Sequence, residues 1–239
     1  MTKVKTGIDG LDELLYGGIP KNRVICLAGG PGAGKSILAI QYLYNGATLF
    51  DEPGIYVSFE ERVSDVIDNM KTIGLNIEEL IENRRIIVHG IRPKMITTND
   101  SPAKPKSIKE FGMDVVIESL KSDTEEIGAK RVVLDSASGL SLQTPDIFEI
   151  RQTILKLVGA IQDLGATAII TTERPLGSKN VTRFGIEEFI THGVIMLDQK
   201  GIERSIQVLK MRGSRLKEGR YPYEITDKGI VVHSEARID

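Results

Sequence analysis

The sequence predicts an α/β fold: a mostly parallel central sheet flanked by helices and extended at the C-terminal end by antiparallel strands. Two observations lead to this prediction. Short apolar runs of strand length alternate with longer stretches of helical periodicity through residue 172. Beyond it, the strand-like segments 192–198, 203–211 and 230–233 follow one another with few helices between them. We expect residues 1–239 to form a single domain.

The alternating elements can be placed along the chain. Strand-like runs lie at 24–28, 55–59, 85–89, 132–135 and 167–172. Helical stretches lie at 34–49, 63–73, 76–82, 108–127 and 146–164, and Asp146 is the candidate N-cap of the last one. Residues 6–20 predict a short N-terminal helix between two glycine turns, and the proline-containing residues 91–107 predict a mobile loop.

Composition excludes several classes of protein. Hydrophobic residues make up 41% and charged residues 27% of the chain, as in an ordinary globular protein. The net charge of −2 provides no global basic field for nucleic acid. The single cysteine, Cys26, rules out a disulfide framework and reads as a small buried hydrophobe, and no Cys/His spacing suggests zinc. Neither a signal core nor a membrane-spanning run is present, so we expect a cytoplasmic protein.

A phosphate-binding loop is the strongest local signal. Residues 29–36, GGPGAGKS, fit the Walker A pattern G-x-x-x-x-G-K-[ST] between an apolar run and a helical stretch. The glycines let backbone N–H groups converge on phosphate oxygens, Lys35 brings a positive charge to the β- and γ-phosphates, and the Ser36 hydroxyl is placed to bind Mg²⁺. The candidate nucleotide-binding residues are Gly30, Pro31, Gly32, Ala33, Gly34, Lys35, Ser36 and Ile37.

Carboxylates follow two other predicted strands. Asp135 ends the apolar run 132–135 in the Walker B manner and would hold Mg²⁺ through water, opposite Ser36. Glu60 and Glu61 end the run 55–59, at the edge of a parallel sheet where ligands bind. They could polarise an attacking water or form a solvated pair favoured by the next helix. Because adjacent side chains diverge, we favour Glu60 as the base and Glu61 as its support.

Two cations near the C-terminus lie on one face of a strand end. Alternation places Lys210 and Arg212 together, where they could meet a γ-phosphate as an arginine-finger pair. The alternative is an exposed edge strand protected from association by its charges. The residues taken alone favour this alternative.

Motifs spread over nearly the whole chain resemble one known family. They lie at 6–12, 17–20, 29–36, 57–61, 171–174, 183–189, 210–214 and 221–230. In this order and spacing, they resemble the KaiC-like branch of the RecA superfamily of P-loop ATPases. The resemblance implies a RecA-like core that assembles as a ring, usually a hexamer, with ATP between its subunits.

The resemblance also implies roles for individual residues. It makes Glu60 and Glu61 catalytic carboxylates, and it reverses the preference for the charged edge strand. In similar proteins this strand contacts the ATP of the neighbouring subunit, and the matching residues here are Lys210, Met211, Arg212, Ser214 and Asp227. A finger supplied by a neighbour would couple hydrolysis to assembly. Residues near Thr72 and Asp227 are candidate adenine contacts.

Two features of the family are not carried over. The clock protein of the family has two such domains in tandem, whereas this sequence carries one, so we do not infer clock function. Ser178 and Thr182 lie in the region of that protein's phosphorylated pair, but they are not adjacent, so we predict no autokinase activity.

Three functions remain to be distinguished. The first is a Mg²⁺-dependent ATPase working as a ring. The second is a nucleotide-gated scaffold that binds a protein partner with incidental turnover. The third is a recombinase-like DNA-dependent ATPase using Arg174, Lys179 and Arg183, against which the balanced charge and the lack of interleaved aromatic residues argue.

Overall fold

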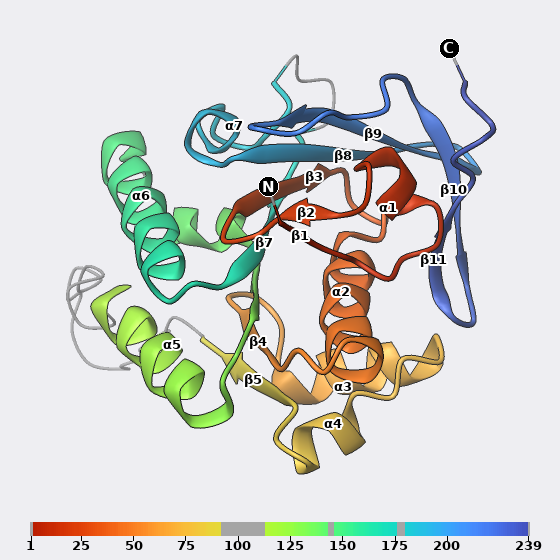
Figure 1. The fold of residues 1–239 in the computed structure, drawn as a ribbon. Helices are drawn as coiled ribbons and strands as arrows, with labels where there is room; N and C mark the ends of the chain where they lie inside the picture. Colours follow the sequence, from red (N-terminus) through yellow and green to blue (C-terminus); the bar gives the residue numbers. More distant parts are fainter. Residues whose placement is uncertain (1, 92–112, 143–145, 176–179, 239) are drawn as a thin grey trace, which may run out of the picture.

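A twisted sheet of nine strands runs through the part of the chain that the structure describes (Figure 1). The structure is a computed structural model and describes residues 2–91, 113–142, 146–175 and 180–238. The sheet order is β11-β10-β9-β8-β3-β7-β6-β4-β5. Its parallel strands are β3 (Val24–Gly29), β4 (Gly54–Ser58), β5 (Ile86–Gly90), β6 (Arg131–Asp135), β7 (Thr167–Glu173) and β8 (Gly193–Lys200).

The antiparallel extension continues from β8. It consists of β9 (Glu203–Met211), β10 (Tyr221–Thr226) and β11 (Gly229–Val232). The predicted change from parallel to antiparallel pairing is therefore confirmed. Strand β10 was not among the predicted segments, because Pro222 interrupts its pattern. The structure accommodates this proline near the start of the strand, where β10 pairs with β9 over only Tyr221 and Pro222.

Helices cover both faces of the sheet, as Figure 1 shows. One face packs against α2 (Lys35–Leu49), α3 (Val63–Thr72) and α4 (Glu78–Glu82), and the other against α5 (Met113–Ile127) and α6 (Ile147–Asp163). Strand residues alternate between two cores, so Val133 faces α2 whereas Leu134 faces α5 and α6. The shorter helices are η2 (Ala137–Leu142) and α7 (Glu187–Ile190).

The predicted parallel strands each lie within one residue of their expected bounds. The helix predictions are confirmed to a similar degree, and Asp146 caps α6 by accepting a hydrogen bond of 2.8 Å from the backbone N–H of Phe148. Cys26 is buried as expected, and burial raises the pKa of its thiol. Most of the predicted loop 91–107, and the predicted helix start at 108–112, lie outside the described residues.

The N-terminal segment packs on the same face of the sheet as α2 (Figure 1). The predicted short helix is present as α1 (Leu11–Leu14), and it lies between β1 (Lys3–Val4) and β2 (Ile19–Pro20), which pair with each other. That two-residue ribbon was not predicted, because so short a pairing leaves no periodic pattern.

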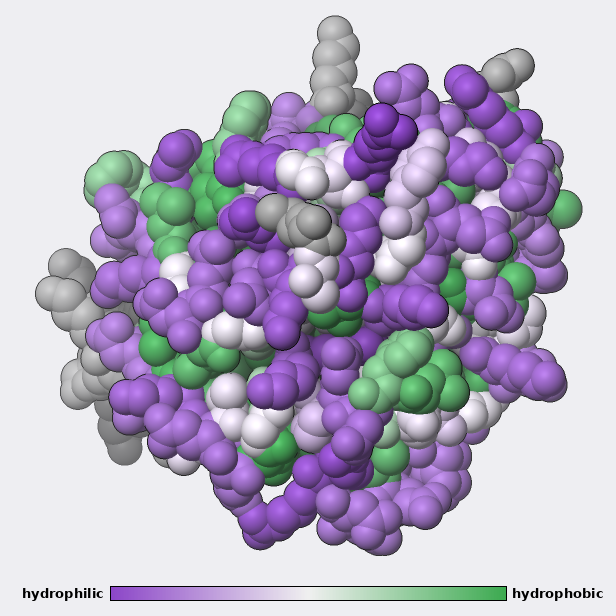
Figure 2. Space-filling model, viewed as in Figure 1, coloured by the Kyte–Doolittle hydropathy of each residue, from purple (hydrophilic) through white to green (hydrophobic). Residues whose placement is uncertain are grey.

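Hydrophilic side chains dominate the face drawn in Figure 2, where hydrophobic residues gather in separate small groups. Among the described residues, no helix combines the length and the apolar character that crossing a membrane requires.

Candidate nucleotide-binding site

The phosphate loop connects β3 to α2 at the carboxyl edge of the parallel strands. Gly32 and Gly34 have positive φ angles of 74° and 82°, which favour glycine. At Gly30, no heavy atom lies within 4 Å of the position that a Cβ would occupy. The loop therefore lies between a strand and a helix, as its sequence predicts. The space next to Gly30 is free of other described heavy atoms.

Lys35 begins α2 and reaches back over the loop. Its ammonium group donates a hydrogen bond of 3.0 Å to the carbonyl oxygen of Gly30. Burial lowers the pKa of Lys35, and the charges of Asp135, Glu173 and Glu60 partly oppose this shift. Within the described part of the chain, no carboxylate lies at salt-bridge distance from the ammonium group. A half-buried cation in this position is suited to an anionic ligand.

The other predicted loop residues differ in their surroundings. Pro31 and Gly32 are exposed, whereas Ala33 is buried and its carbonyl oxygen accepts a hydrogen bond of 2.5 Å from the Tyr223 hydroxyl. The side chain of Ile37 packs against the core beneath α2. Ala33 and Ile37 thus support the loop from below, and only their backbone groups are available to a phosphate.

Asp135 lies at the end of β6 and is held by two buried hydroxyl groups. Tyr56 on β4 donates a hydrogen bond of 2.5 Å to Oδ2, and Thr171 on β7 donates to Oδ1. Burial and the negative charge of Asp135 raise the pKa of Tyr56. Asp135, one of the two predicted metal ligands, is therefore oriented by hydroxyl groups from the two strands that flank β6.

Sequence reasoning did not identify Tyr56 or Thr171. The available signal was positional: β4, β6 and β7 each direct alternate residues toward α2, and these two polar side chains lie on that face. The sequence did not reveal which strands are neighbours, and β6 separates β4 from β7 in the sheet.

Glu60 and Glu61 follow β4 and diverge as expected. Glu60 accepts a hydrogen bond of 2.8 Å from the Ser136 hydroxyl, next to the end of β6. The backbone N–H of Glu61 donates a hydrogen bond of 2.9 Å to the Ser58 hydroxyl. Partial burial raises the pKa of Glu61, the charge of Asp135 adds to this effect, and the Asn69 hydrogen bond opposes it. A raised pKa favours general-base behaviour, so Glu61 is a candidate base alongside Glu60.

The basic residues considered for DNA contacts follow β7. The Arg183 guanidinium donates a hydrogen bond of 2.6 Å to the Glu173 carboxylate. A guanidinium nitrogen of Arg174 lies 3.8 Å from a carboxylate oxygen of Asp198. Lys179 and Ser178 lie outside the described residues. Thr182 is fully buried and donates a hydrogen bond to Glu188. The two described arginines thus already have acidic partners.

Lys210 and Arg212 lie away from the phosphate loop of their own chain. Lys210 is paired with Val194 near the start of β8, and the backbone N–H of Arg212 donates to His192 just before it. Strand β8 runs parallel to β3, so these cations lie toward the opposite edge from Gly29, and Arg212 is ~17 Å from it along the strand direction.

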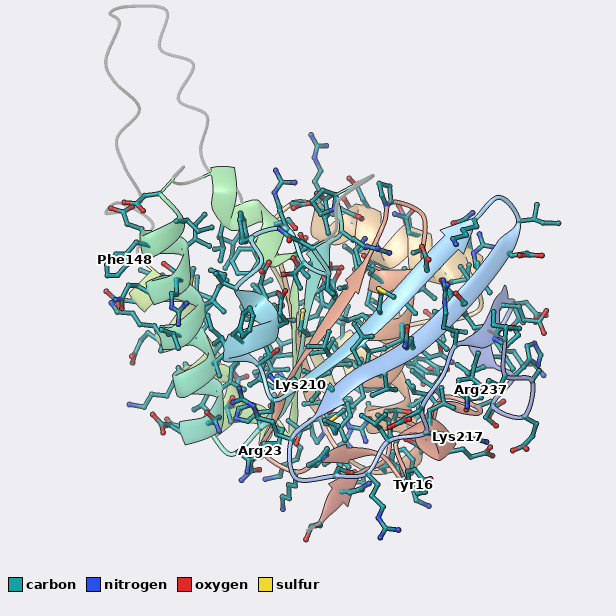
Figure 3. The ribbon with its side chains drawn as sticks, turned by 90° about the horizontal axis from the view of Figure 1, so that it is seen from above. Tyr16, Arg23, Phe148, Lys210, Lys217 and Arg237 are labelled. Carbon is teal, nitrogen blue, oxygen red and sulfur yellow. The ribbon has the colours of Figure 1, made fainter. Side chains whose placement is uncertain are left out.

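Both cations bind carbonyl groups at the end of α7. The ammonium group of Lys210 donates to the carbonyl oxygens of Glu188 at 2.6 Å and Thr191 at 2.8 Å. The Arg212 guanidinium donates to the carbonyl oxygen of Phe189 at 2.9 Å. Burial lowers the pKa of Lys210, and the neighbouring charge of Arg212 lowers it further. Figure 3 shows Lys210 at this edge, beside β8 and β9.

Asp227 lies apart from Lys210, Arg212 and Ser214. It occupies the turn between β10 and β11, beside Gly74, where a Cβ would lie 1.9 Å from the Asp227 carbonyl oxygen. Ser214 lies in the turn that follows β9. Within one subunit these residues therefore lie apart, and Asp227 lies beside Gly74, two residues after Thr72.

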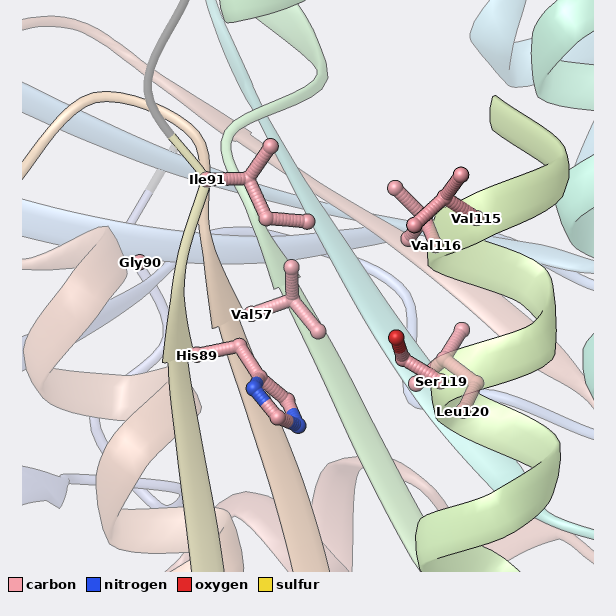
Figure 4. Close-up of a pocket in the computed structure, with 8 residues that line it drawn as sticks. All are labelled: Val57, His89, Gly90, Ile91, Val115, Val116, Ser119 and Leu120. Atoms are coloured by element: carbon pink, nitrogen blue, oxygen red, sulfur yellow. The ribbon is translucent and has the colours of Figure 1, made fainter. Parts of the chain in front are cut away.

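Two of the cavities formed by the described residues lie outside the phosphate loop. One, of about 330 Å³, lies between α2, the N-terminal segment and the β10–β11 turn, and Asp227 lines it. The other, of about 170 Å³, lies between β4, β5 and α5 (Figure 4). His89 lines it and also contacts Asp123. The second cavity contains none of the predicted site residues.

A phosphate loop after β3, a buried carboxylate at the end of β6 and this strand order define a P-loop nucleotide-binding protein with a RecA-like core. Comparison with known proteins assigns the family. The family model described as "ATPase: KaiC" matches residues 4–237. The chain therefore belongs to the KaiC family of ATPases.

Individual relatives agree with this assignment. The circadian clock oscillator protein KaiC of Nostoc sp. is 34% identical over 95% of this chain and 43% of its own length. The clock protein KaiC2 of Synechocystis sp. is 35% identical over 97% of this chain and 40% of its own. This chain thus spans less than half the length of these curated relatives.

A solved structure matches the full extent of the chain. The KaiC-like protein from the hyperthermophilic archaeon Pyrococcus horikoshii is 36% identical, with a TM-score of 0.83 over 97% of this chain and 99% of that one. The predicted α/β fold and the resemblance to the KaiC-like branch of the RecA superfamily are therefore confirmed.

Proposed function

We propose that this protein hydrolyses ATP with Mg²⁺ as a ring-shaped homo-oligomer, usually a hexamer in similar proteins. In this proposal each subunit supplies Lys210 and Arg212 to the ATP held by its neighbour's phosphate loop. The position of these cations supports it, since Arg212 lies toward the opposite edge of the sheet from Gly29. A subunit cannot use them on its own nucleotide, but a ring could place this edge against the next loop.

Residues 30–37 would hold the phosphates, with the Lys35 charge directed at the β- and γ-phosphates. Ser36 and Asp135 offer a hydroxyl and a carboxylate, oxygen ligands that suit Mg²⁺. The described residues contain no group of three or more His, Cys, Asp or Glu side chains that could hold a metal. Water and phosphate oxygens would therefore complete the coordination. Bound Mg²⁺ would neutralise developing phosphate charge, and Glu60 with Glu61 would orient the attacking water.

The remaining residues would complete the interface. Met211, Ser214 and Asp227 would meet the neighbour's nucleotide together with Arg212, and residues near Thr72 and Asp227 would contact the adenine. Lys210 and Arg212 would exchange α7 carbonyl oxygens for phosphate oxygens, which are stronger acceptors because they are charged. The clock activity of the longer relatives is not part of the proposal.

Phosphate release from Mg-ATP, measured across protein concentrations with molar mass in parallel, tests this function. Specific activity should rise as the ring assembles. Arg212→Ala should lower kcat by about 10³-fold or more while retaining ATP binding, because it removes charge stabilisation from the transition state alone. Arg151→Ala, which removes an exposed arginine on α6, serves as the matched control.

Two results would contradict the proposal. Full activity of a dilute monomer would exclude fingers supplied by a neighbour. Assembly on ATP with no more phosphate release than the Glu60→Gln, Glu61→Gln double variant would replace the enzyme by a nucleotide-gated scaffold.

A further inference from the structure

The hairpin formed by β10 and β11 lies at the edge of the sheet, beside α2 (Figure 1). Among the described residues, β10 pairs with β9 over Tyr221 and Pro222 alone, and from Tyr223 to Thr226 it pairs with β11. A two-stranded hairpin has little stability of its own. The position of its tip therefore depends on contacts with the rest of the fold.

Gln41 on α2 makes a polar contact with the tip of this hairpin. It is 5% exposed. Its amide oxygen accepts a hydrogen bond of 2.7 Å from the Ile230 N–H, and its amide nitrogen donates to the carbonyl oxygens of Ile230 at 3.2 Å and Lys228 at 3.4 Å. Gln41 thus pairs with both backbone groups of Ile230, as a neighbouring strand would.

Gly229 lets the backbone of the turn approach this amide. Its φ angle is 93°, and a Cβ at this position would lie 2.5 Å from the Gln41 amide oxygen. Farther from the turn, the Tyr223 hydroxyl donates a hydrogen bond to the carbonyl oxygen of Ala33 in the phosphate loop. The hairpin is therefore attached to the phosphate loop at one point and to Gln41 near its tip.

The turn that Gln41 holds carries Asp227, the proposed adenine contact. Asp227 is exposed, and its carbonyl oxygen lies against Gly74, where a Cβ would be 1.9 Å away. The Thr226 hydroxyl donates a hydrogen bond of 3.0 Å to the carbonyl oxygen of Gly229, which closes the turn. Asp227 is thus an exposed residue on a backbone that is fixed on both sides.

We infer that Gln41 is a positioning residue for the base of the bound nucleotide. It does not contact the base. It holds the backbone of the turn, and through it the place at which Asp227 meets the adenine. Loss of the amide would therefore weaken the part of the affinity that depends on the base and leave the phosphate contacts in place. The inference rests on the adenine contact of the proposed function.

Asn45 offers a matched control one turn further along α2. It is 8% exposed, and its amide nitrogen donates hydrogen bonds to the carbonyl oxygens of Thr6 at 3.3 Å and Gly7 at 2.8 Å. These carbonyl groups belong to the N-terminal segment. Asn45→Leu therefore removes a buried amide from the same helix and leaves the contacts of Gln41 with the turn in place.

The experiment measures the affinities of ADP and of pyrophosphate, each with Mg²⁺, by isothermal titration calorimetry. Pyrophosphate can occupy the phosphate loop but has no base, so the ratio of the two affinities reports the base contact. Gln41→Met, which keeps the length of the side chain, should weaken ADP binding by about tenfold, because binding would then also have to order the turn. It should leave pyrophosphate affinity unchanged, and Asn45→Leu should change neither affinity.

The alternative results separate the inference from the proposed function. Unchanged ADP affinity in Gln41→Met, or equal weakening of both ligands, would overturn the inference and leave the proposed function intact. The same change of ratio in Asn45→Leu would also overturn it, because any loosening of α2 would then suffice.

The wild-type protein provides a further test. ADP binding no tighter than pyrophosphate binding would exclude the adenine contact and with it the inference, whereas binding of neither ligand would overturn the proposed function as well. If Gln41→Met does not fold, Gln41→Glu, which keeps the shape of the side chain but loses the two donated hydrogen bonds, gives the same comparison.

Discussion

Strand β6 carries a buried charged residue at each end, and the two ends differ in how that charge is satisfied. Arg131 begins the strand and Asp135 ends it. Arg131 is 0% exposed and Asp135 is 9% exposed, so neither charge is stabilised mainly by bulk water. The partners of these two charges show which end of the strand serves stability and which is available to a ligand.

The protein alone satisfies Arg131. Its guanidinium donates to Glu52 at 2.5 and 2.8 Å, to the carbonyl oxygen of Tyr42 at 2.7 Å and to that of Lys5 at 2.9 Å. It also lies over the rings of Tyr42 and Phe50, 4.5 and 5.2 Å from their centroids. Arg131 thus links the N-terminal segment, α2 and β6 through a closed set of contacts.

Among the described residues, the donors to the Asp135 carboxylate are neutral: the hydroxyls of Tyr56 and Thr171. Lys35, whose pKa the charge of Asp135 raises, donates its hydrogen bond to the carbonyl oxygen of Gly30 instead. Its charge is therefore oriented but not neutralised, which leaves the site able to attract a cation. The comparison teaches that burial alone does not mark a functional charge, whereas an incomplete set of partners does.

The largest expected effect concerns stability. Arg131→Met should lower the free energy of unfolding by about 3–5 kcal/mol, because it leaves the Glu52 carboxylate without its buried partner. Nucleotide affinity of the folded fraction should not change, since Arg131 lies at the end of β6 away from the phosphate loop. Denaturant titration with and without ADP checks both expectations.

Arg84 is the control for Arg131, because it also forms an ion pair but its side chain is exposed. Arg84 pairs with Glu126, and its side chain is 72% exposed, so Arg84→Met should cost less than about 1 kcal/mol. Equal losses for the two variants would show that the enclosure of Arg131 is not what stabilises the fold.

The opposite end of the strand should show the reverse pattern. Asp135→Asn should lower kcat by about 10²–10³-fold, because it removes charge that holds the metal in the transition state. Stability should change by less than about 1 kcal/mol, because the amide keeps one oxygen to accept a hydroxyl proton. Phosphate release and denaturant titration on one preparation measure both quantities. A stability loss as large as that of Arg131→Met would contradict the proposed difference between the ends.

The smallest expected effect depends on pH. Burial lowers the pKa of Lys35, so the unfolded chain binds its proton more tightly than the folded protein does. Stability should therefore increase as pH rises from the folded-state pKa toward about 10.4, the ordinary value for lysine. Lys35→Met should stabilise the nucleotide-free protein near neutral pH, by about 1 kcal/mol at most.

Denaturant titrations of this variant and the wild-type protein between pH 7 and 10 measure the effect. The difference between the two proteins should shrink as the pH rises. A difference that stays constant over this range would contradict a buried, charged Lys35.

The sequence predicted most of the parallel sheet because each buried strand is a short apolar run that ends at a turn. It also predicted the phosphate loop and Asp135, because loop chemistry and strand-end position are local properties. Strand β10 was missed because Pro222 interrupts its alternating pattern. The burial of Arg131 was not predicted, because a single arginine before an apolar run is typical of an exposed strand end.

Local patterns thus determined the class of this protein, the order of its main elements and the phosphate-loop motif between β3 and α2. Tertiary structure alone decided which strands are neighbours, and therefore that Tyr56, Asp135 and Thr171 meet across β4, β6 and β7. It also decided that Lys210 and Arg212 lie toward the edge opposite their own phosphate loop. The physical reason is that strand order and chain direction arise from packing between distant segments, which no local sequence pattern encodes.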